Sequence, residues 1–321
     1  MFKIEQVFVP VDFSRASKAA LGLATNLPGA RVQLAHVIEP WPPYIQRVLF
    51  PYAGMGEDTA EFERELVESA FAELRSFYDL ENTLGQHDPK PLVTAGVVKE
   101  KLPEMLSATP SDIVVMGSHG RSGALPESLG STCGRLLRTS AQPVLFVREH
   151  ASTPKIEKIL CAIDLSSRCH EIVAAAMSLA LDLDAELETV FVLPDPLHQD
   201  VHNMLQGHIK FNGKKVLDKE RHKLDALFER AYNQLDLTYP DKNRIVQRWR
   251  QRKVLVGNPA DEIISRADTR DADLIVVGNR NLQATKSASL GRTAWAVARA
   301  ATTNVLVVPL SPEAHILNSN D

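Results

Sequence analysis

A glycine-rich stretch at residues 117–132, GSHGRSGALPESLGST, has the spacing in this chain that is best suited to chemistry. Its glycines and closing hydroxyl pair stand in the order Gly117, Gly120, Gly130, Ser131 and Thr132. A strand-like run, DIVVM at residues 112–116, precedes it, and a helical run follows it. Glycine lets a backbone approach an anion closely, and the first N–H groups of a helix point toward such an anion. The stretch is therefore a candidate phosphate-binding loop.

The elements that must position this loop occur twice. Residues 4–14, IEQVFVPVDFS, reappear as residues 156–166, IEKILCAIDLS. Residues 112–117, DIVVMG, reappear as DLIVVG, which ends at Gly278. An internal repeat of this length predicts two domains of ordinary size, which we place at residues 1–150 and 155–312.

Each copy alternates apolar strands with helices. In the first copy we expect strands at residues 7–11, 32–37, 92–95, 113–116 and 143–147, and helices at 15–26, 57–80, 99–107 and 134–139. Strands rich in Val, Ile and Leu that alternate with helices indicate an α/β doubly wound fold, with a parallel sheet covered on both faces. Ligands bind such sheets at the carboxyl ends of the strands, where Asp12 and the glycine loop both lie.

Composition narrows the class of protein. The chain has 321 residues, 44% of them hydrophobic, and a net charge of −4, so nucleic acid is not expected as a partner. We interpret the basic run at 244–253, RIVQRWRQRK, as a charged edge strand. Three cysteines without a CxxC pair, and histidines without a third ligand at fixed spacing, predict no metal site. The N-terminus has no signal-peptide pattern and no apolar run approaches about 20 residues, so we expect a cytoplasmic protein without a membrane span.

Three features together resemble the universal stress protein family. They are P-x-D-x-S at residues 10–14, the AHV end of the second strand at residues 35–37, and G-x2-G-x9-G-[S/T] from Gly117. The resemblance covers about residues 3–148 and 156–310 and identifies the chain as a tandem member. It implies five strands per domain in the order 3-2-1-4-5, an adenine nucleotide α-hydrolase-like fold. It also implies that the two domains pair through their fifth strands as a pseudo-dimer, while a homodimer of the whole chain stays open.

The resemblance further implies a site for ATP, or another adenine nucleotide, in the first copy. Asp12 would lie near the ribose or adenine, Val37 would pack on the adenine ring, and the loop would hold the phosphates, with Arg121 as an added cation. The implied set is Pro10, Val11, Asp12, Val37, Met116, Gly117, His119, Gly120, Arg121, Gly130, Ser131 and Thr132. Asp12 can equally accept a hydrogen bond in the turn near Ser14. Magnesium stays open as a companion of the nucleotide.

The second copy has changed at the corresponding positions. It keeps Asp164, Gly278 and Gly291. Asn281 and Arg292 stand where the first copy has Gly120 and Ser131. We therefore expect a degraded phosphate loop that does not hold ATP in the family's way. Asp164, Gly278, Gly291 and Arg292 form a second candidate site, in which Arg292 either fills the phosphate position or binds an anion.

These features predict a stress-response protein whose N-terminal domain uses an adenine nucleotide as a sensor or regulatory switch. No nucleophile, general base or carboxylate cluster accompanies the loop, so we expect no catalytic residue and at most slow ATP hydrolysis. A protein that binds no nucleotide, and instead holds a partner or an apolar ligand, remains an alternative. An enzyme of adenylyl or phosphoryl transfer is a further one, which the absence of SGGxDS and HIGH motifs disfavours.

Overall fold

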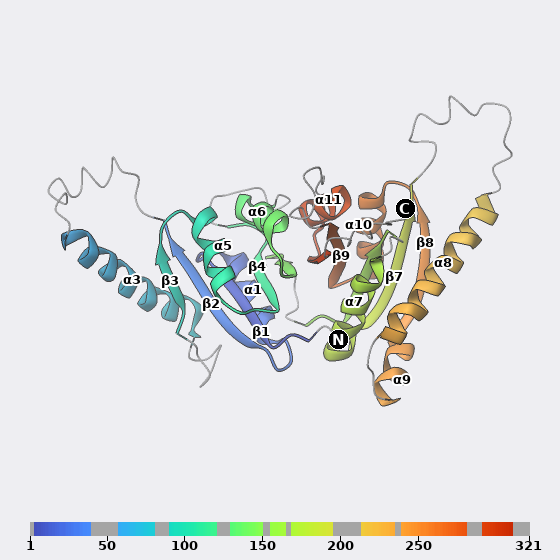
Figure 1. Cartoon of the computed structure of the whole chain (residues 1–321), viewed down its shortest axis with the longest axis horizontal. Helices are drawn as coiled ribbons and strands as arrows, with labels where there is room; N and C mark the ends of the chain where they lie inside the picture. The colour runs from blue at the N-terminus through green and yellow to red at the C-terminus, as the bar shows by residue number, and fades with distance from the viewer. Residues whose placement is uncertain are drawn as a thin grey trace, which may run out of the picture. The chain divides into compact units, whose positions relative to one another are not determined.

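The computed structural model describes residues 3–39, 57–80, 90–120, 129–149, 155–164, 168–194, 213–234, 239–280 and 291–310. The chain divides into two compact units, of which one takes residues 3–136 and 144–155 and the other takes the remaining residues. We call them the first and the second unit. The domain boundaries at residues 150 and 155 stay predictions. Figure 1 shows strands and helices alternating along both units.

The first unit is the predicted α/β fold. Its strands are β1 (Gln6–Val11), β2 (Arg31–Ile38), β3 (Leu92–Ala95), β4 (Ile113–Gly117) and β5 (Val144–Val147). Its helices are α1 (Arg15–Thr25), α3 (Glu57–Tyr78), α5 (Val98–Ala108) and α6 (Ser131–Thr139). All pairings are parallel and the order is β3-β2-β1-β4-β5, so the predicted order 3-2-1-4-5 is confirmed. The last helix begins at Ser131, three residues before the predicted start.

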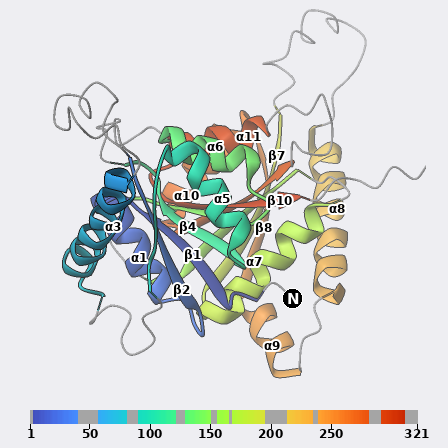
Figure 2. The same ribbon diagram turned by 60° about the vertical axis from the view of Figure 1, so that its left-hand side comes forward.

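Helices cover both faces of these strands. In Figure 1 and Figure 2, α1 and α3 lie on one face of the first unit's strands and α5 and α6 lie on the other. The strands are apolar on both faces because both are covered: every residue of β4 and of β5 is buried. This arrangement leaves the carboxyl ends of β1 and β4 next to each other at one edge of the first unit.

The second unit repeats the plan with the strand order β8-β7-β6-β9-β10. Its strands are β6 (Lys158–Ile163), β7 (Glu186–Leu193), β8 (Trp249–Val256), β9 (Leu274–Arg280) and β10 (Asn304–Leu310). Its helices are α7 (Cys169–Leu183), α8 (Gly213–Gln234), α9 (Tyr239–Arg248), α10 (Pro259–Arg270) and α11 (Arg292–Ala300). The prediction of one strand over the basic run 244–253 was wrong, because its first half belongs to α9 and only residues from Trp249 onward form β8.

An aspartate holds the first and fourth strands together at their amino ends in both units. Asp112 Oδ2 accepts the backbone N–H groups of Glu5 and Gln6, both at 2.8 Å. Asp273 Oδ2 accepts those of the matching residues 157 and 158, both at 2.9 Å. The repeat therefore preserves a structural carboxylate at the edge of the sheet opposite to Asp12.

Within the described residues, none of the helices has the length and apolar character that crossing a bilayer requires. The described side chains also include no group of three or more histidines, cysteines or carboxylates that could hold a metal ion.

Candidate functional site

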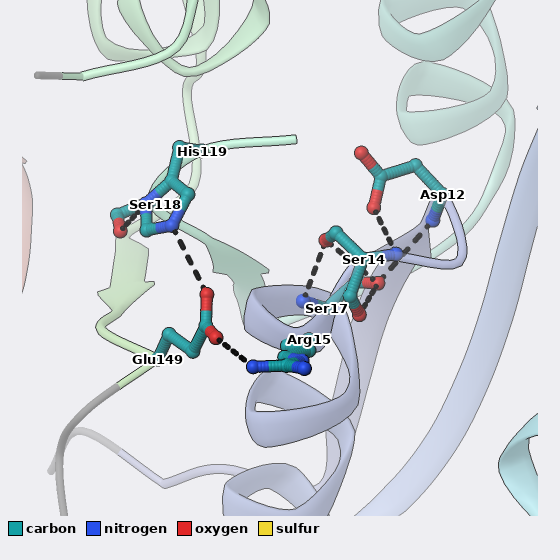
Figure 3. Close-up of polar contacts among 7 residues, drawn as sticks. All are labelled: Asp12, Ser14, Arg15, Ser17, Ser118, His119 and Glu149. Carbon is teal, nitrogen blue, oxygen red and sulfur yellow. Dashed lines mark hydrogen bonds and ion pairs between the residues drawn. The ribbon is translucent and has the colours of Figure 1, made fainter. Parts of the chain in front are cut away.

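Asp12 lies in the short connection between β1, which ends at Val11, and α1, which begins at Arg15. Its Oδ1 atom accepts the backbone N–H of Ser14 at 3.1 Å. Ser14 in turn caps α1, because its Oγ accepts the backbone N–H of Ser17 at 3.0 Å. Figure 3 shows this arrangement. One carboxylate oxygen of Asp12 therefore serves the turn, as the sequence allowed, while its second oxygen faces the glycine loop.

The glycine loop approaches Asp12 at Gly120. A Cβ atom added to Gly120 would overlap Oδ2 of Asp12 and lie 3.6 Å from its Cγ. The structure thus brings together the aspartate after β1 and the glycine after β4, two of the predicted site residues that stand more than a hundred positions apart in the sequence. Gly120 has no positive φ, so close approach explains the glycine and left-handed backbone does not.

Gly117 makes a second close approach. A Cβ atom on Gly117 would lie 2.7 Å from the carbonyl carbon of Ala16 and 2.8 Å from the backbone nitrogen of Ser17. These are backbone atoms of the first turn of α1, so β4 and α1 can meet this closely only where a side chain is missing. At Gly130, in contrast, an added Cβ would come no closer than 3.5 Å to its nearest neighbour.

Backbone hydrogen bonds hold the two ends of the loop together. The N–H of Ser118 donates to the carbonyl of Val147 on β5, and the N–H of Gly130 donates to the carbonyl of Ser118, both at 2.9 Å. Because α6 begins at Ser131, the first N–H groups of this helix lie at the closed base of the loop. Residues 121–128, which include Arg121, lie outside the described residues.

Cys133 strengthens this closure from inside α6. Its thiol is buried and donates to the carbonyl of Gly117, with 3.2 Å between Sγ and the oxygen. Burial, and after it the negative charge of Asp12, raise the pKa of the Cys133 thiol to about 12. The group is therefore a neutral thiol at physiological pH that ties the helix to the end of β4.

His119 contacts a residue that the sequence did not single out. Its Nε2 atom lies 3.4 Å from Oε2 of Glu149, and its Nδ1 lies 3.0 Å from Oγ of Ser118. The other oxygen of Glu149 lies 3.5 Å from a guanidinium nitrogen of Arg15 (Figure 3). Glu149 was predictable in principle: it follows β5, and β5 pairs with β4, whose end leads into His119.

Four apolar residues of the predicted site come from three adjacent strands. Pro10 and Val11 are the last residues of β1, which pairs with β2 and β4. Val37 on β2 and Met116 on β4 are buried near the ends of these flanking strands. These four residues therefore lie toward the carboxyl ends of neighbouring strands, at the edge of the first unit where Asp12 follows β1.

An aromatic cluster beside Asp12 was missed in the sequence. Phe13 has a φ of 62°, an unusual value for a residue with a side chain. Its N–H donates to the hydroxyl of Tyr78 at 2.9 Å, and the same hydroxyl lies 2.7 Å from Oγ of Ser17. The Phe13 ring meets the ring of His36 edge-on, with centroids 4.9 Å apart. Helix α3 thus fixes the Asp12 turn through Tyr78, which no spacing in the sequence indicated.

The second unit differs at the matching place. There β9 continues past Gly278 through Asn279 and Arg280, both paired with β10, whereas β4 ends at Gly117. A Cβ on Gly278 would overlap the side chain of Ile172 on α7, whereas a Cβ on Gly117 would overlap backbone atoms of α1. The strand thus occupies positions that belong to the loop in the first unit.

The remaining predicted residues of the second copy lie at the start of α11 and directly after β6. Gly291 donates its N–H to Oδ1 of Asn279 at 3.3 Å. Arg292 is exposed as the first residue of α11, and Asp164 is exposed directly after β6. Asn281 lies outside the described residues. The second candidate site, with Asp164, Gly278, Gly291 and Arg292, stays a prediction.

The strand order defines a doubly wound α/β protein, and the glycine loop of the first unit follows β4 at the switch point of this order. The model of the universal stress protein family matches residues 3–148 and again residues 155–309, so the chain belongs to this family as a tandem member.

Known proteins agree with this assignment. The chain is 28% identical over 159 residues to universal stress protein MJ0577 of Methanocaldococcus jannaschii, which covers 46% of this chain and 97% of that protein. The crystal structure of a universal stress protein from Archaeoglobus fulgidus matches with a TM-score of 0.63 at 17% identity, over 95% of this chain and 98% of its own. Protein PA1789 of Pseudomonas aeruginosa, described as functionally unknown, matches with a TM-score of 0.58 at 14% identity, over 96% and 93%. These two structures share the fold.

Proposed function

We propose that the first unit binds ATP or another adenine nucleotide at the edge formed by Asp12 and the glycine loop. The observation that carries this proposal is the contact between Gly120 and Oδ2 of Asp12. It brings a carboxylate suited to ribose hydroxyls or to an adenine amino group next to a loop suited to phosphates. A nucleotide is a ligand that needs both chemistries at this spacing.

Three features support the phosphate end. The bonds of Gly130 and Ser118 hold the two ends of the loop together, so the base of the loop forms without a ligand. The N-terminus of α6 follows directly, and its first N–H groups and dipole favour an anion. Ser131 and Thr132 in the first turn add hydroxyl groups. Magnesium would accompany a triphosphate as its counter-ion, with its remaining ligands supplied by water.

The nucleoside end is supported by apolar strand ends. Val37 and Met116 flank β1 on either side, and Pro10 and Val11 end it. An adenine ring packs favourably on such aliphatic side chains because its faces are poorly hydrated. Asp12 at the centre of this edge would then fix the orientation of the nucleoside.

Regulation is the role we propose for the bound nucleotide. Both ring nitrogens of His119 already have partners, Ser118 and Glu149, so this histidine is not poised as a general base, and we expect at most slow hydrolysis. A bound nucleotide would instead order the glycine loop and change what the protein presents to a partner. The second unit would serve as a diverged partner domain in a pseudo-dimer. A homodimer and a cytoplasmic location are also part of the proposal. The three cysteines are buried thiols, which is compatible with a reducing compartment.

A thermal-shift titration with ATP and magnesium tests the proposal. We expect ATP to raise the melting temperature of the protein, and we expect Gly120→Asn to abolish the shift, because its side chain would displace the Asp12 carboxylate. Gly22→Asn is the matched control, since Gly22 in α1 has nothing within 4 Å of an added Cβ. A shift that survives Gly120→Asn would move the site elsewhere, and no shift in the unchanged protein would refute nucleotide binding.

A further inference from the structure

Among the described contacts, Glu149 supplies the only carboxylate that lies against a side chain of the glycine loop. One of its oxygens lies 3.4 Å from Nε2 of His119 and the other lies 3.5 Å from Nη1 of Arg15 (Figure 3). A carboxylate can only accept, so the Nε2–H of His119 and the guanidinium of Arg15 are the donors in these two contacts. Two donors beside the loop are therefore directed at one internal anion.

These contacts are not needed to close the base of the loop. Its base is fixed by the backbone bonds of Ser118 and Gly130 and by the Cys133 thiol, none of which involves Glu149. The Glu149 side chain is 24% exposed and the Arg15 side chain 87% exposed, so both can move into solvent without opening the core. Ion pairs this exposed contribute little to stability.

A phosphate on the loop would need the same donors. His119 immediately precedes Gly120, the glycine that meets Asp12, so its side chain belongs to the described start of the loop that we propose for the phosphates. Arg15 begins α1 at the same edge and would pair with a phosphate oxygen better than with a single carboxylate oxygen. The Glu149 charge, left in place, would repel each added phosphate.

We propose that Glu149 is an internal competitor of the nucleotide's terminal phosphates, so that it sets how strongly the site distinguishes a triphosphate from a monophosphate. This inference rests on the proposed nucleotide site and specifies its ligand preference. Binding of ATP displaces the Glu149 carboxylate from His119 and Arg15, which then hold the outer phosphates. AMP, whose single phosphate sits on the backbone of the loop, leaves the Glu149 contacts in place.

The opposite role for Glu149 predicts the opposite result. If Glu149 served to position His119 for the ligand, its removal would weaken ATP binding. If it competes, its removal strengthens ATP binding, and the gain grows with the number of phosphates. The sign of the change in affinity therefore separates the two roles.

Titration calorimetry of the full chain with AMP, ADP and ATP, in buffer containing magnesium, tests the proposal. We expect Glu149→Gln to tighten ATP binding by about fivefold to tenfold, from the release of two exposed pairs and the loss of one like charge, and to change AMP binding less than about twofold. Arg15→Gln should weaken ATP binding and spare AMP binding. Glu5→Gln is the control, because it removes the same charge before β1, at the edge opposite to Asp12.

Each result has a distinct meaning. Unchanged or weaker ATP binding by Glu149→Gln, or an equal gain for all three nucleotides, would overturn the competition. An equal gain in ATP binding by Glu5→Gln would show a general charge effect and overturn it too. Absence of heat with every nucleotide in the unchanged protein would instead refute the proposed function itself.

Discussion

Replacing Gly117 with alanine should destabilise the first unit, whereas the same replacement at Gly130 should not. A Cβ on Gly117 would lie 2.7 and 2.8 Å from backbone atoms of Ala16 and Ser17. These atoms belong to the capped first turn of α1, whose N-cap is Ser14, so they cannot move without shifting the helix away from β4. Overpacking of this kind costs about 2–3 kcal/mol.

Gly130 provides the contrast within the same loop. Its added Cβ would be in ordinary contact, at 3.5 Å from Cα of His119 and 3.6 Å from the carbonyl oxygen of Ser118. Alanine there also restricts the unfolded chain, which stabilises by about 0.5 kcal/mol where the backbone allows it. We therefore expect Gly130→Ala to leave the free energy of unfolding unchanged or slightly raised.

Urea unfolding followed by circular dichroism measures both effects in the full chain. The midpoint of the first unit's transition should fall for Gly117→Ala and stay within error for Gly130→Ala. Equal midpoints for the two variants would refute the reasoning, because they would show that α1 and β4 do not meet as closely as the missing Cβ requires.

Two further perturbations test how the Asp12 turn and the strand ends are held. Tyr78→Phe leaves the Phe13 N–H and the Ser17 hydroxyl without their shared partner, so we expect a loss of about 1–2 kcal/mol in unfolding free energy. Burial raises the pKa of Tyr78 to about 12, above its value of about 10 in the unfolded chain. Its contribution is therefore complete below pH 10 and is lost as the pH rises to about 12, so the unchanged protein should lose stability more steeply than Tyr78→Phe in alkaline urea titrations. Asp112→Ala and Asp273→Ala each remove an acceptor of two backbone N–H groups, and each should cost about 1–2 kcal/mol; no cost in either would contradict a structural role.

Much of the first unit could be predicted because its signals are local. Runs of Val, Ile and Leu placed the strands, and the glycine spacing after β4 together with Asp12 after β1 placed the site at one edge. The contact between Asp12 and Gly120 follows from this topology, since parallel strands next to each other bring their carboxyl ends together. That this contact leaves no room for a side chain at position 120 could not be predicted, because residue spacing does not report the distance between a Cβ atom and a carboxylate.

The contacts that could not be predicted from the sequence depend on pairing between distant segments. Glu149 reaches His119 only through the register of β4 and β5, and Tyr78 reaches Phe13 only through the placement of α3. In the second copy, Asn279 matches a loop residue of the first copy by position, yet the pairing of β9 with β10 keeps it in a strand. Such pairing is decided by packing over the whole unit rather than by the residue types at one position.

The stoichiometry of ATP binding to the full chain tests the central claim most directly. We expect titration calorimetry to find a single adenine nucleotide bound per chain, and to find none for Gly120→Asn at unchanged circular dichroism. No binding to the unchanged protein, or equal binding to Gly120→Asn, would contradict a nucleotide site formed by Asp12 and the glycine loop of the first unit.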